Sequence, residues 1–148
     1  MAVIRKMKIE DLDKCSGVYR SAYAAEPWRE EYTDEEIRKY LADFMESDSM
    51  HCFVLEENAA VIGLALTIRV PCTGGPYLRI EDFCIGAEYQ RKGSGSIFLG
   101  LLTEEAKKMG CDSILLGTQR GFPSHRFYLK NGFREIETAL LYRETDGR

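Results

Sequence analysis

Apolar side chains recur at helical spacing along two segments near the start of the chain. Residues 9–24 and the segment that begins at Thr33 each carry one apolar stripe, which predicts two amphipathic helices. Pro27 separates them because proline cannot continue a helix, and Thr33 with Glu36 forms a capping box that marks the second start. The stripe residues are Leu12, Cys15, Tyr19, Ala22 and Tyr23 in the first helix and Ile37, Tyr40, Leu41, Phe44 and Met45 in the second.

Runs rich in aliphatic, β-branched and aromatic residues predict the strands. Two of these runs are joined across Glu57 and Asn58 at hairpin spacing. A helix over residues 94–109, ended by Gly110, and a short helix over 124–130 are expected in the second half. The predicted strands cover residues 2–7, 51–56, 60–69, 77–85 and 111–117, and one or two closing strands are expected within 133–143.

This alternation of strands and helices, with hairpins at both ends, predicts an α/β fold in which helices cover a mixed sheet. The chain has no internal repeat and no long linker, and its 148 residues are enough to bury a core without disulfides or metals. We therefore expect a single domain over residues 1–148.

The composition narrows the classes of function and location. A net charge of −4 argues against a general affinity for nucleic acid or anionic membranes. No apolar run approaches the roughly 20 residues that span a bilayer, and the first residues lack the apolar core of a secretion signal. The five cysteines are odd in number and never form CxxC, and only His51 and His125 could assist them as metal ligands. We expect a cytoplasmic protein with reduced thiols and no metal.

The segment QRKGSGS, Gln90 to Ser96, joins a predicted strand to a predicted helix. The first N–H groups of a helix have no partner within it, and together with the helix dipole they form an anion site. Gly93 and Gly95 would let a phosphate approach the backbone, and Arg91 and Lys92 add positive charge. The alternative is a tight turn with no ligand. The P-loop pattern GxxxxGK[ST] is absent, and the third glycine of GxGxxG is missing.

Residues 90–95 also match the pattern [Q/R]-x-x-G-x-[G/A], which resembles the signature of the GNAT superfamily of acetyl-coenzyme A-dependent N-acetyltransferases. The segment IEDFCIGAEY (80–89) is similar to the family's fourth strand and its entry to this loop, and FYLKNGF (127–133) to its FYxKxGF segment. The resemblance implies a mixed sheet of about six or seven strands flanked by about four helices, with splayed parallel fourth and fifth strands. It also implies an enzyme of the acyltransferase class.

The resemblance further implies where acetyl-CoA would bind. The pantetheine arm would pair with the exposed backbone of Phe83, Cys84 and Ile85, as an added strand would. The pyrophosphate would lie on main-chain amides of the loop, whose residues are Gln90, Arg91, Lys92, Gly93, Ser94, Gly95 and Ser96. Many family members carry an asparagine seven residues before the tyrosine of FYxKxGF, but this chain has Gly121 there.

The same resemblance implies candidate roles in acetyl transfer. Glu81 is the first candidate for the base that deprotonates the amine, and its neighbour Asp82 is the second. Strand alternation would place Glu81 on the face of Phe83 and Ile85, with Asp82 on the other. The Ile85 N–H is the candidate donor to the oxyanion, and Tyr128 the candidate acid for the departing thiolate. The alternative reading is that the two acids flank a sheet end and Tyr128 packs in a core.

The acceptor is expected to meet the region between the first two helices. A cationic amine could be attracted there by charge and by cation–π interaction with Trp28, Glu31, Tyr32 and Asp82. The alternative is that the acids only cap a helix, since acidic residues are common in the first turn. We expect a small amine such as a polyamine, amino sugar or aminoglycoside, or a protein amine, bound by a monomer or homodimer. The alternative function is a regulatory module that binds acyl-CoA without turnover, and a third is an interaction protein without CoA affinity.

Overall fold

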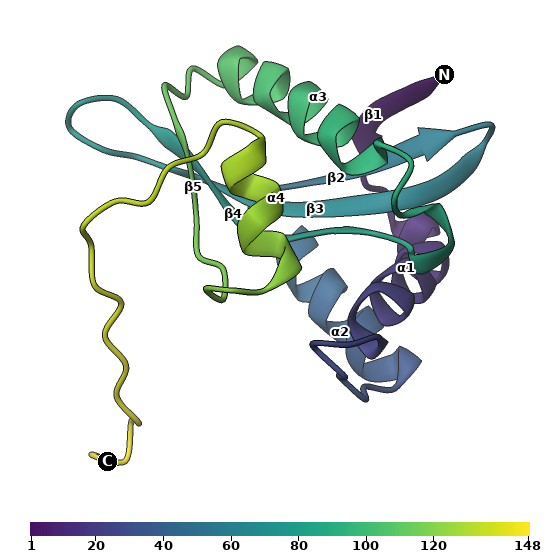
Figure 1. Ribbon diagram of the computed structural model, residues 1–148, viewed down its shortest axis with the longest axis horizontal. Coiled ribbons are helices and arrows are strands. Elements are labelled where there is room, and N and C mark those ends of the chain that lie inside the picture. The colour runs from purple at the N-terminus through teal and green to yellow at the C-terminus, as the bar shows by residue number, and fades with distance from the viewer. The chain divides into compact units, whose positions relative to one another are not determined.

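Five strands form one mixed sheet within the first 117 residues (Figure 1). The computed structural model describes all residues from 1 to 148, which divide into two units, 1–117 and 118–148. Neighbouring strands are antiparallel except for the last pair, which is parallel. In their order across the sheet, the strands are β1 (Ala2–Lys6), β2 (Met50–Glu57), β3 (Ala60–Val70), β4 (Tyr77–Ile85) and β5 (Ile114–Leu116).

Helices cover both faces of this sheet (Figure 1). The 3₁₀ turn η1 (Ile9–Asp11) leads into α1 (Leu12–Ala24), which lies with α2 (Asp34–Met45) on one face, while α3 (Ser94–Lys108) lies on the other. The capping box at the start of α2 is confirmed: Thr33 Oγ1 accepts from the Glu36 N–H at 3.1 Å, and the Glu36 carboxylate accepts from the Thr33 N–H. The predicted start of the third helix at Ser94 is also confirmed.

The apolar stripes of α1 and α2 pack on alternate residues of the central strands. Leu12, Cys15 and Val18 of α1 and Ile37 and Leu41 of α2 are buried in this core. Their partners in the strands are Cys52, Val54, Val61, Leu64, Leu66 and Cys84. Each helix buries its apolar stripe and leaves its charged side in water, as the sequence pattern predicted.

The opposite core is formed by α3, whose Phe98 and Leu102 are completely buried. The Phe98 ring stacks on Phe83 of β4 with 5.0 Å between ring centroids. Gly63 of β3 is needed at this contact, since a Cβ there would lie 2.7 Å from Ile85 Cδ1 and 2.9 Å from the Cys84 carbonyl oxygen. Glycine therefore lets β3, β4 and α3 approach closely.

The second unit contains one helix, α4 (Pro123–Lys130), and no strand. The predicted closing strands within 133–143 are wrong, and the sheet has five strands rather than six or seven. Leu140, Leu141 and Tyr142 are between 84% and 94% exposed. Their apolar composition suggests a strand, but a strand also needs a neighbour for its main-chain hydrogen bonds, and composition does not specify one. Strand β5 is likewise shorter than predicted: the Cys111 N–H donates to the Ala106 carbonyl oxygen of α3, and the Asp112 N–H donates to the Pro76 carbonyl oxygen in the loop before β4.

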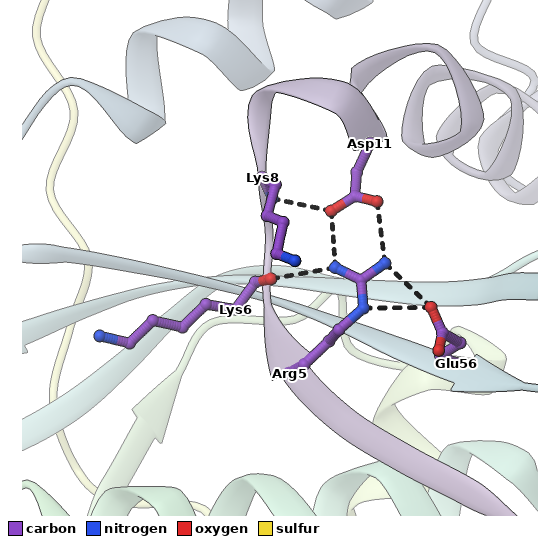
Figure 2. Close-up of polar contacts among 5 residues, drawn as sticks. All are labelled: Arg5, Lys6, Lys8, Asp11 and Glu56. Carbon is purple, nitrogen blue, oxygen red and sulfur yellow. Dashed lines mark hydrogen bonds and ion pairs between the residues drawn. The ribbon is translucent and has the colours of Figure 1, made fainter. Parts of the chain in front are cut away.

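An ion-pair network anchors the edge strand β1 to its surroundings (Figure 2). Arg5 donates to both carboxylate oxygens of Asp11 at 2.8 and 2.9 Å, and it donates through Nε and Nη2 to Glu56 of β2. Asp11 also accepts from the main-chain N–H of Lys8 at 2.7 Å. The hydrogen bond from Arg5 is the main cause that holds the pKa of Asp11 below its ordinary value of 3.8. Asp11 is thus a buried carboxylate with a full set of partners.

We predict that Asp11→Asn lowers the free energy of unfolding by about 2 kcal/mol, because it removes charge-assisted hydrogen bonds at a buried position. Since the pKa of Asp11 is lowered by folding, its contribution is present above pH 3.8 and is lost as the pH falls through its folded pKa. Urea unfolding at pH 7 and at pH 3 measures both effects. Glu56→Gln, at the more exposed end of the network, should lower the free energy of unfolding by less than Asp11→Asn does. Equal decreases in the two variants would contradict this account.

Candidate functional site

Strand β4 carries a bulge at Glu81. Asp82 is paired with Leu66 and Ile80 with Thr67, so Glu81 has no partner on β3. Because paired residues share a face, Asp82 and Cys84 lie toward α1 and α2, while Phe83 and Ile85 lie on the α3 side. The expectation that Glu81 shares a face with Phe83 and Ile85 assumed unbroken alternation, which the bulge interrupts. Glu81 instead forms an ion pair with Arg79 and is partly exposed.

Asp82 lies beneath α1 and α2, where two tyrosine hydroxyls hold its carboxylate. Tyr23 of α1 donates to Oδ1 at 2.9 Å, and Tyr40 of α2 donates to Oδ2. Burial raises the pKa of Asp82 above its ordinary value of 3.8; the two tyrosine hydrogen bonds oppose this shift, and the charge of Glu81 adds to it. No lysine, arginine or histidine forms an ion pair with Asp82. This carboxylate is therefore partly buried without a counter-ion.

Aromatic rings gather around these hydroxyls. Tyr19 lies with its ring centroid 4.6 Å from that of Tyr23 and 5.8 Å from that of Tyr40. Trp28, in the loop after α1, meets the Tyr23 ring edge-on at 5.6 Å. The loop then folds back on α1, since the Glu30 N–H donates to the Tyr23 carbonyl oxygen at 2.8 Å. Rings and loop together form one aromatic cluster above Asp82.

A shallow, open pocket with no enclosed cavity lies beside this cluster. Glu30 is the acidic residue that lines this pocket, and its pKa is raised by burial and by the charge of Asp82. Glu31, the acid that the sequence suggested, is exposed and does not line the pocket. Tyr32 lines the pocket, and its contact with a ligand remains a prediction from the sequence. The complete lining is Tyr19, Arg20, Tyr23, Glu30, Tyr32 and Ile37.

The glycine loop joins the end of β4 to α3. Gly93 caps the helix in the left-handed region at φ 83°, and Arg91 has φ 63°. Gln90 Nε2 donates to the Ile85 carbonyl oxygen at 2.8 Å, which ties the loop to the last residue of β4. The first hydrogen bond into the helix is from the Ile97 N–H to Gly93, so the N–H groups of Ser94 to Ser96 have no partner within α3. Unpaired donors of this kind at a helix start are the groups that an anion requires.

Strand β5 does not pair with β4 beyond Ile80. The pairing with β5 ends at Ile80 and Leu116, whereas β4 continues to Ile85. Since Gly86 donates to Ile62 of β3 at 2.8 Å, alternation along the ladder directs the Cys84 N–H toward β3 and those of Phe83 and Ile85 toward the opposite edge. Cys84 has a pKa raised by burial, which favours its thiol form and a packing role.

Tyr128 lies in the second unit, within α4. It is buried, and its ring lies 5.2 Å from that of Phe127 and 5.3 Å from that of Phe133. In the same unit, Gly121 has φ 88° and donates its N–H to His125 Nδ1. His125 Nε2 meets Glu135 at 2.8 Å, so this histidine is engaged with the loop and with Glu135. The role of Tyr128 remains a prediction from the sequence.

Four residues near Asp82 were not recognised as functional candidates: Tyr19, Tyr23, Glu30 and Tyr40. The three tyrosines were interpreted as part of the apolar stripes, which they are. A signal was present, because a buried tyrosine hydroxyl requires a hydrogen-bond partner, and three such hydroxyls on two adjacent helices imply a polar group beneath them. Nothing in the sequence distinguishes Glu30 from its neighbours.

No three acidic, cysteine or histidine side chains are grouped so that they could hold a metal ion. None of the helices has both the length and the apolar character needed to cross a membrane.

Comparison with known proteins matches this chain to acetyltransferases both in sequence and in fold. The sequence model of the acetyltransferase (GNAT) family matches residues 17–133. A Bacillus subtilis (strain 168) protein described as "Uncharacterized N-acetyltransferase YhdJ" is 33% identical over 130 residues, covering 78% of this chain and 90% of that protein. Both the sequence model and this relative therefore span most of the chain.

Solved structures share the fold at low sequence identity. A GNAT family acetyltransferase from Staphylococcus aureus subsp. aureus USA300_TCH1516 has a TM-score of 0.77 at 19% identity, covering 97% of this chain and 98% of that one. The aminoglycoside N-acetyltransferase AAC(6')-Iy in complex with CoA has a TM-score of 0.76 at 18% identity, covering 98% and 95%. These similarities establish the fold and leave the acceptor open.

We predict that the stability of the wild-type protein falls relative to Asp82→Asn as the pH rises above 4. Folding raises the pKa of Asp82, so the stability associated with its proton is present below pH 3.8 and is lost as the pH rises through the folded pKa. Thermal or urea unfolding of both proteins between pH 4 and 8 gives the difference. For Asp48→Asn, which removes an exposed carboxylate, the difference from wild type should not vary with pH. A constant difference for Asp82→Asn would refute the prediction.

Proposed function

The chain belongs to the acetyltransferase (GNAT) family and is an acyltransferase, and we propose that it transfers an acetyl group from acetyl-CoA directly to a primary amine. The observation that carries this proposal is the junction of β4 and α3. There, unpaired N–H groups at the start of a helix adjoin the part of β4 that β5 does not pair, and the Gln90–Ile85 hydrogen bond links the two.

The loop after β4 suits a diphosphate. The N–H groups from Arg91 to Ser96 would donate to its oxygens, with Gly95 again leaving room for close approach. Several charge-assisted hydrogen bonds act together here, so the helix dipole, worth about 0.3–1 kcal/mol per charge, is a smaller contribution. The side chains of Lys92 and Arg91 supply positive charge beside the site. The pantetheine arm would pair with the main chain of Phe83 and Ile85, beyond the end of the β5 pairing, while Cys84 would contribute mainly by packing.

Acetyl transfer requires an amine that has lost its proton. Glu81 and Asp82 are the two candidate acceptors of that proton, and their surroundings differ. Glu81 is partly exposed and paired with Arg79, which lowers its availability. Asp82 is partly buried with no counter-ion and has a raised pKa, which suits a proton acceptor near neutral pH. We assign the role first to Asp82 and keep Glu81 as the alternative.

Once the amine is neutral, the acetyl group moves from sulfur to nitrogen through a tetrahedral intermediate. The amine nitrogen attacks the thioester carbon, and the Ile85 N–H stabilises the negative charge on the carbonyl oxygen. The nitrogen then loses its second proton to solvent, the C–S bond breaks, and the CoA thiolate takes a proton that Tyr128 is proposed to donate; solvent restores the proton of Tyr128 and accepts the proton held by the carboxylate base. The products are the N-acetylated amine and free CoA.

A cationic amine is the acceptor class that the α1–α2 region supports. The pocket beside Tyr32 and the rings of Tyr23 and Trp28 would take an alkylammonium group, with Asp82 below them. Its small size favours a polyamine, amino sugar or aminoglycoside over a protein amine. Glu31 is exposed outside the pocket lining, so it would act on a cationic acceptor only through long-range electrostatic attraction.

We predict that Gly93→Ala weakens acetyl-CoA binding about tenfold, because alanine at a left-handed position costs roughly 1–2 kcal/mol and the loop would change its conformation to relieve it. Calorimetric titration of acetyl-CoA measures this. Gly100→Ala is the matched control: it lies within α3 with no atom near the added Cβ, so binding should be unchanged and stability slightly higher. If the wild-type protein takes up no acetyl-CoA at millimolar concentration, the proposed function is wrong.

We predict that Asp82→Asn lowers kcat about a hundredfold near pH 7 and recovers partly at higher pH, where more of the amine is neutral in solution. Glu81→Gln should change kcat less than threefold. Release of free thiol from acetyl-CoA, followed with a panel of amines, measures both. The reverse order would transfer the role to Glu81, and an unchanged pH–rate profile in both variants would remove the carboxylates from proton transfer. Tight acetyl-CoA binding with no transfer to any amine would instead support a regulatory module.

A further inference from the structure

Glu30 contains an unsatisfied buried atom. Its Oε2 is the one buried side-chain oxygen or nitrogen of the chain that has no hydrogen-bond partner. Leaving a buried acceptor unpaired costs on the order of 1–3 kcal/mol, and more when it is charged. The loop nevertheless holds Glu30 in place, because its N–H is bonded to the Tyr23 carbonyl oxygen at 2.8 Å. A ligand that donates to Oε2 would remove this cost.

The charge around Glu30 is unbalanced. Asp82 is near enough for its charge to raise the pKa of Glu30, and neither carboxylate has a cationic partner. Arg20 is the single cation that lines the pocket, and it is engaged in an ion pair with Asp34. The neighbouring Arg29 is paired with Glu26. Two carboxylates therefore lie close to one pocket with their charge uncompensated.

The surfaces around these carboxylates also favour a cation. Tyr19, Tyr23 and Tyr32 line the pocket, and the face of a tyrosine ring attracts an ammonium group. Tyr23 both lines the pocket and donates to Asp82 at 2.9 Å, so it connects the two acids. A metal ion would find too few ligands, since no group of three acidic, cysteine or histidine side chains exists. An anionic or neutral apolar ligand would leave Oε2 unpaired.

We propose that Glu30 binds the distal ammonium group of a diamine acceptor, whose other amine is presented to Asp82. This inference rests on the proposed function, because it takes the reacting amine to lie at β4. A monoamine needs one carboxylate, to receive its proton. The second carboxylate, unpaired and among tyrosine rings, matches a second positive charge on the same substrate. Glu30 thus selects diamines over monoamines of the same length.

The test compares 1,4-diaminobutane with n-butylamine, which has the same carbon chain and no distal charge. For the wild-type enzyme, kcat/KM should be about tenfold to a hundredfold higher for the diamine, the range expected for one charge-assisted hydrogen bond. Glu30→Gln should lose this preference through a higher KM for the diamine, with a much smaller change in kcat/KM for n-butylamine. Glu35→Gln, which removes an exposed acid outside the pocket, should behave as wild type. A Glu30→Gln enzyme that keeps the full preference would overturn the proposal.

A binding measurement separates this proposal from the proposed function. Calorimetric titration of 1,4-diaminobutane into each protein requires no thioester chemistry. Binding by wild type and Glu35→Gln, with about tenfold or greater loss in Glu30→Gln, upholds the ammonium site even if no acetyl group is transferred. Equal affinity in all three proteins, or none in wild type, overturns it whatever the transfer activity. Without ligand, Glu30→Gln should be at least as stable as wild type, since it removes an unpaired buried charge.

Discussion

The uncompensated carboxylate of Asp82 is the constraint on which the arrangement of this site depends. A partly buried charge without a counter-ion must be satisfied by hydrogen bonds, and two tyrosine hydroxyls from different helices supply them. Those bonds tie α1 and α2 to the middle of β4. Alternation from Ile85 directs Asp82 toward the helices while Phe83 and Ile85 pack against α3, and the bulge at Glu81 interrupts the alternation before Asp82.

Three carboxylates of this chain, Asp11, Asp82 and Glu30, fall into two electrostatic classes. Asp11 has Arg5 and a main-chain N–H as donors, and its pKa is lowered. Asp82 and Glu30 have no cation, and their pKa values are raised. The first class stabilises the fold at neutral pH. The second costs stability there, and raised pKa values in a cleft are typical of groups that meet a substrate.

Much of the fold could be predicted because its signals are local. The capping box at Thr33, the helix start at Ser94 and the hairpin between β2 and β3 each depend on a few adjacent residues, and the structure confirms them. The bulge at Glu81 depends on how β3 and β4 pair, which no local pattern specifies. The closing strands failed for the same reason, since apolar residues within 133–143 do not by themselves provide a neighbouring strand.

The residues of the candidate site could likewise be predicted from the sequence only where the signal lies in adjacent residues. The loop from Gln90 to Gly95 could be recognised because its glycines and its position before a helix are written in consecutive residues. Glu30 could not be recognised from the sequence, because it differs from other acids only in having an oxygen that is buried where the loop folds back on α1. The adjacent acid, Glu31, has nearly the same neighbours in the sequence. Choosing between two adjacent acids requires knowing which one lies against Tyr23 and Asp82. The proposed acceptor contacts therefore depend on tertiary structure, whereas the proposed coenzyme loop can be recognised from consecutive residues.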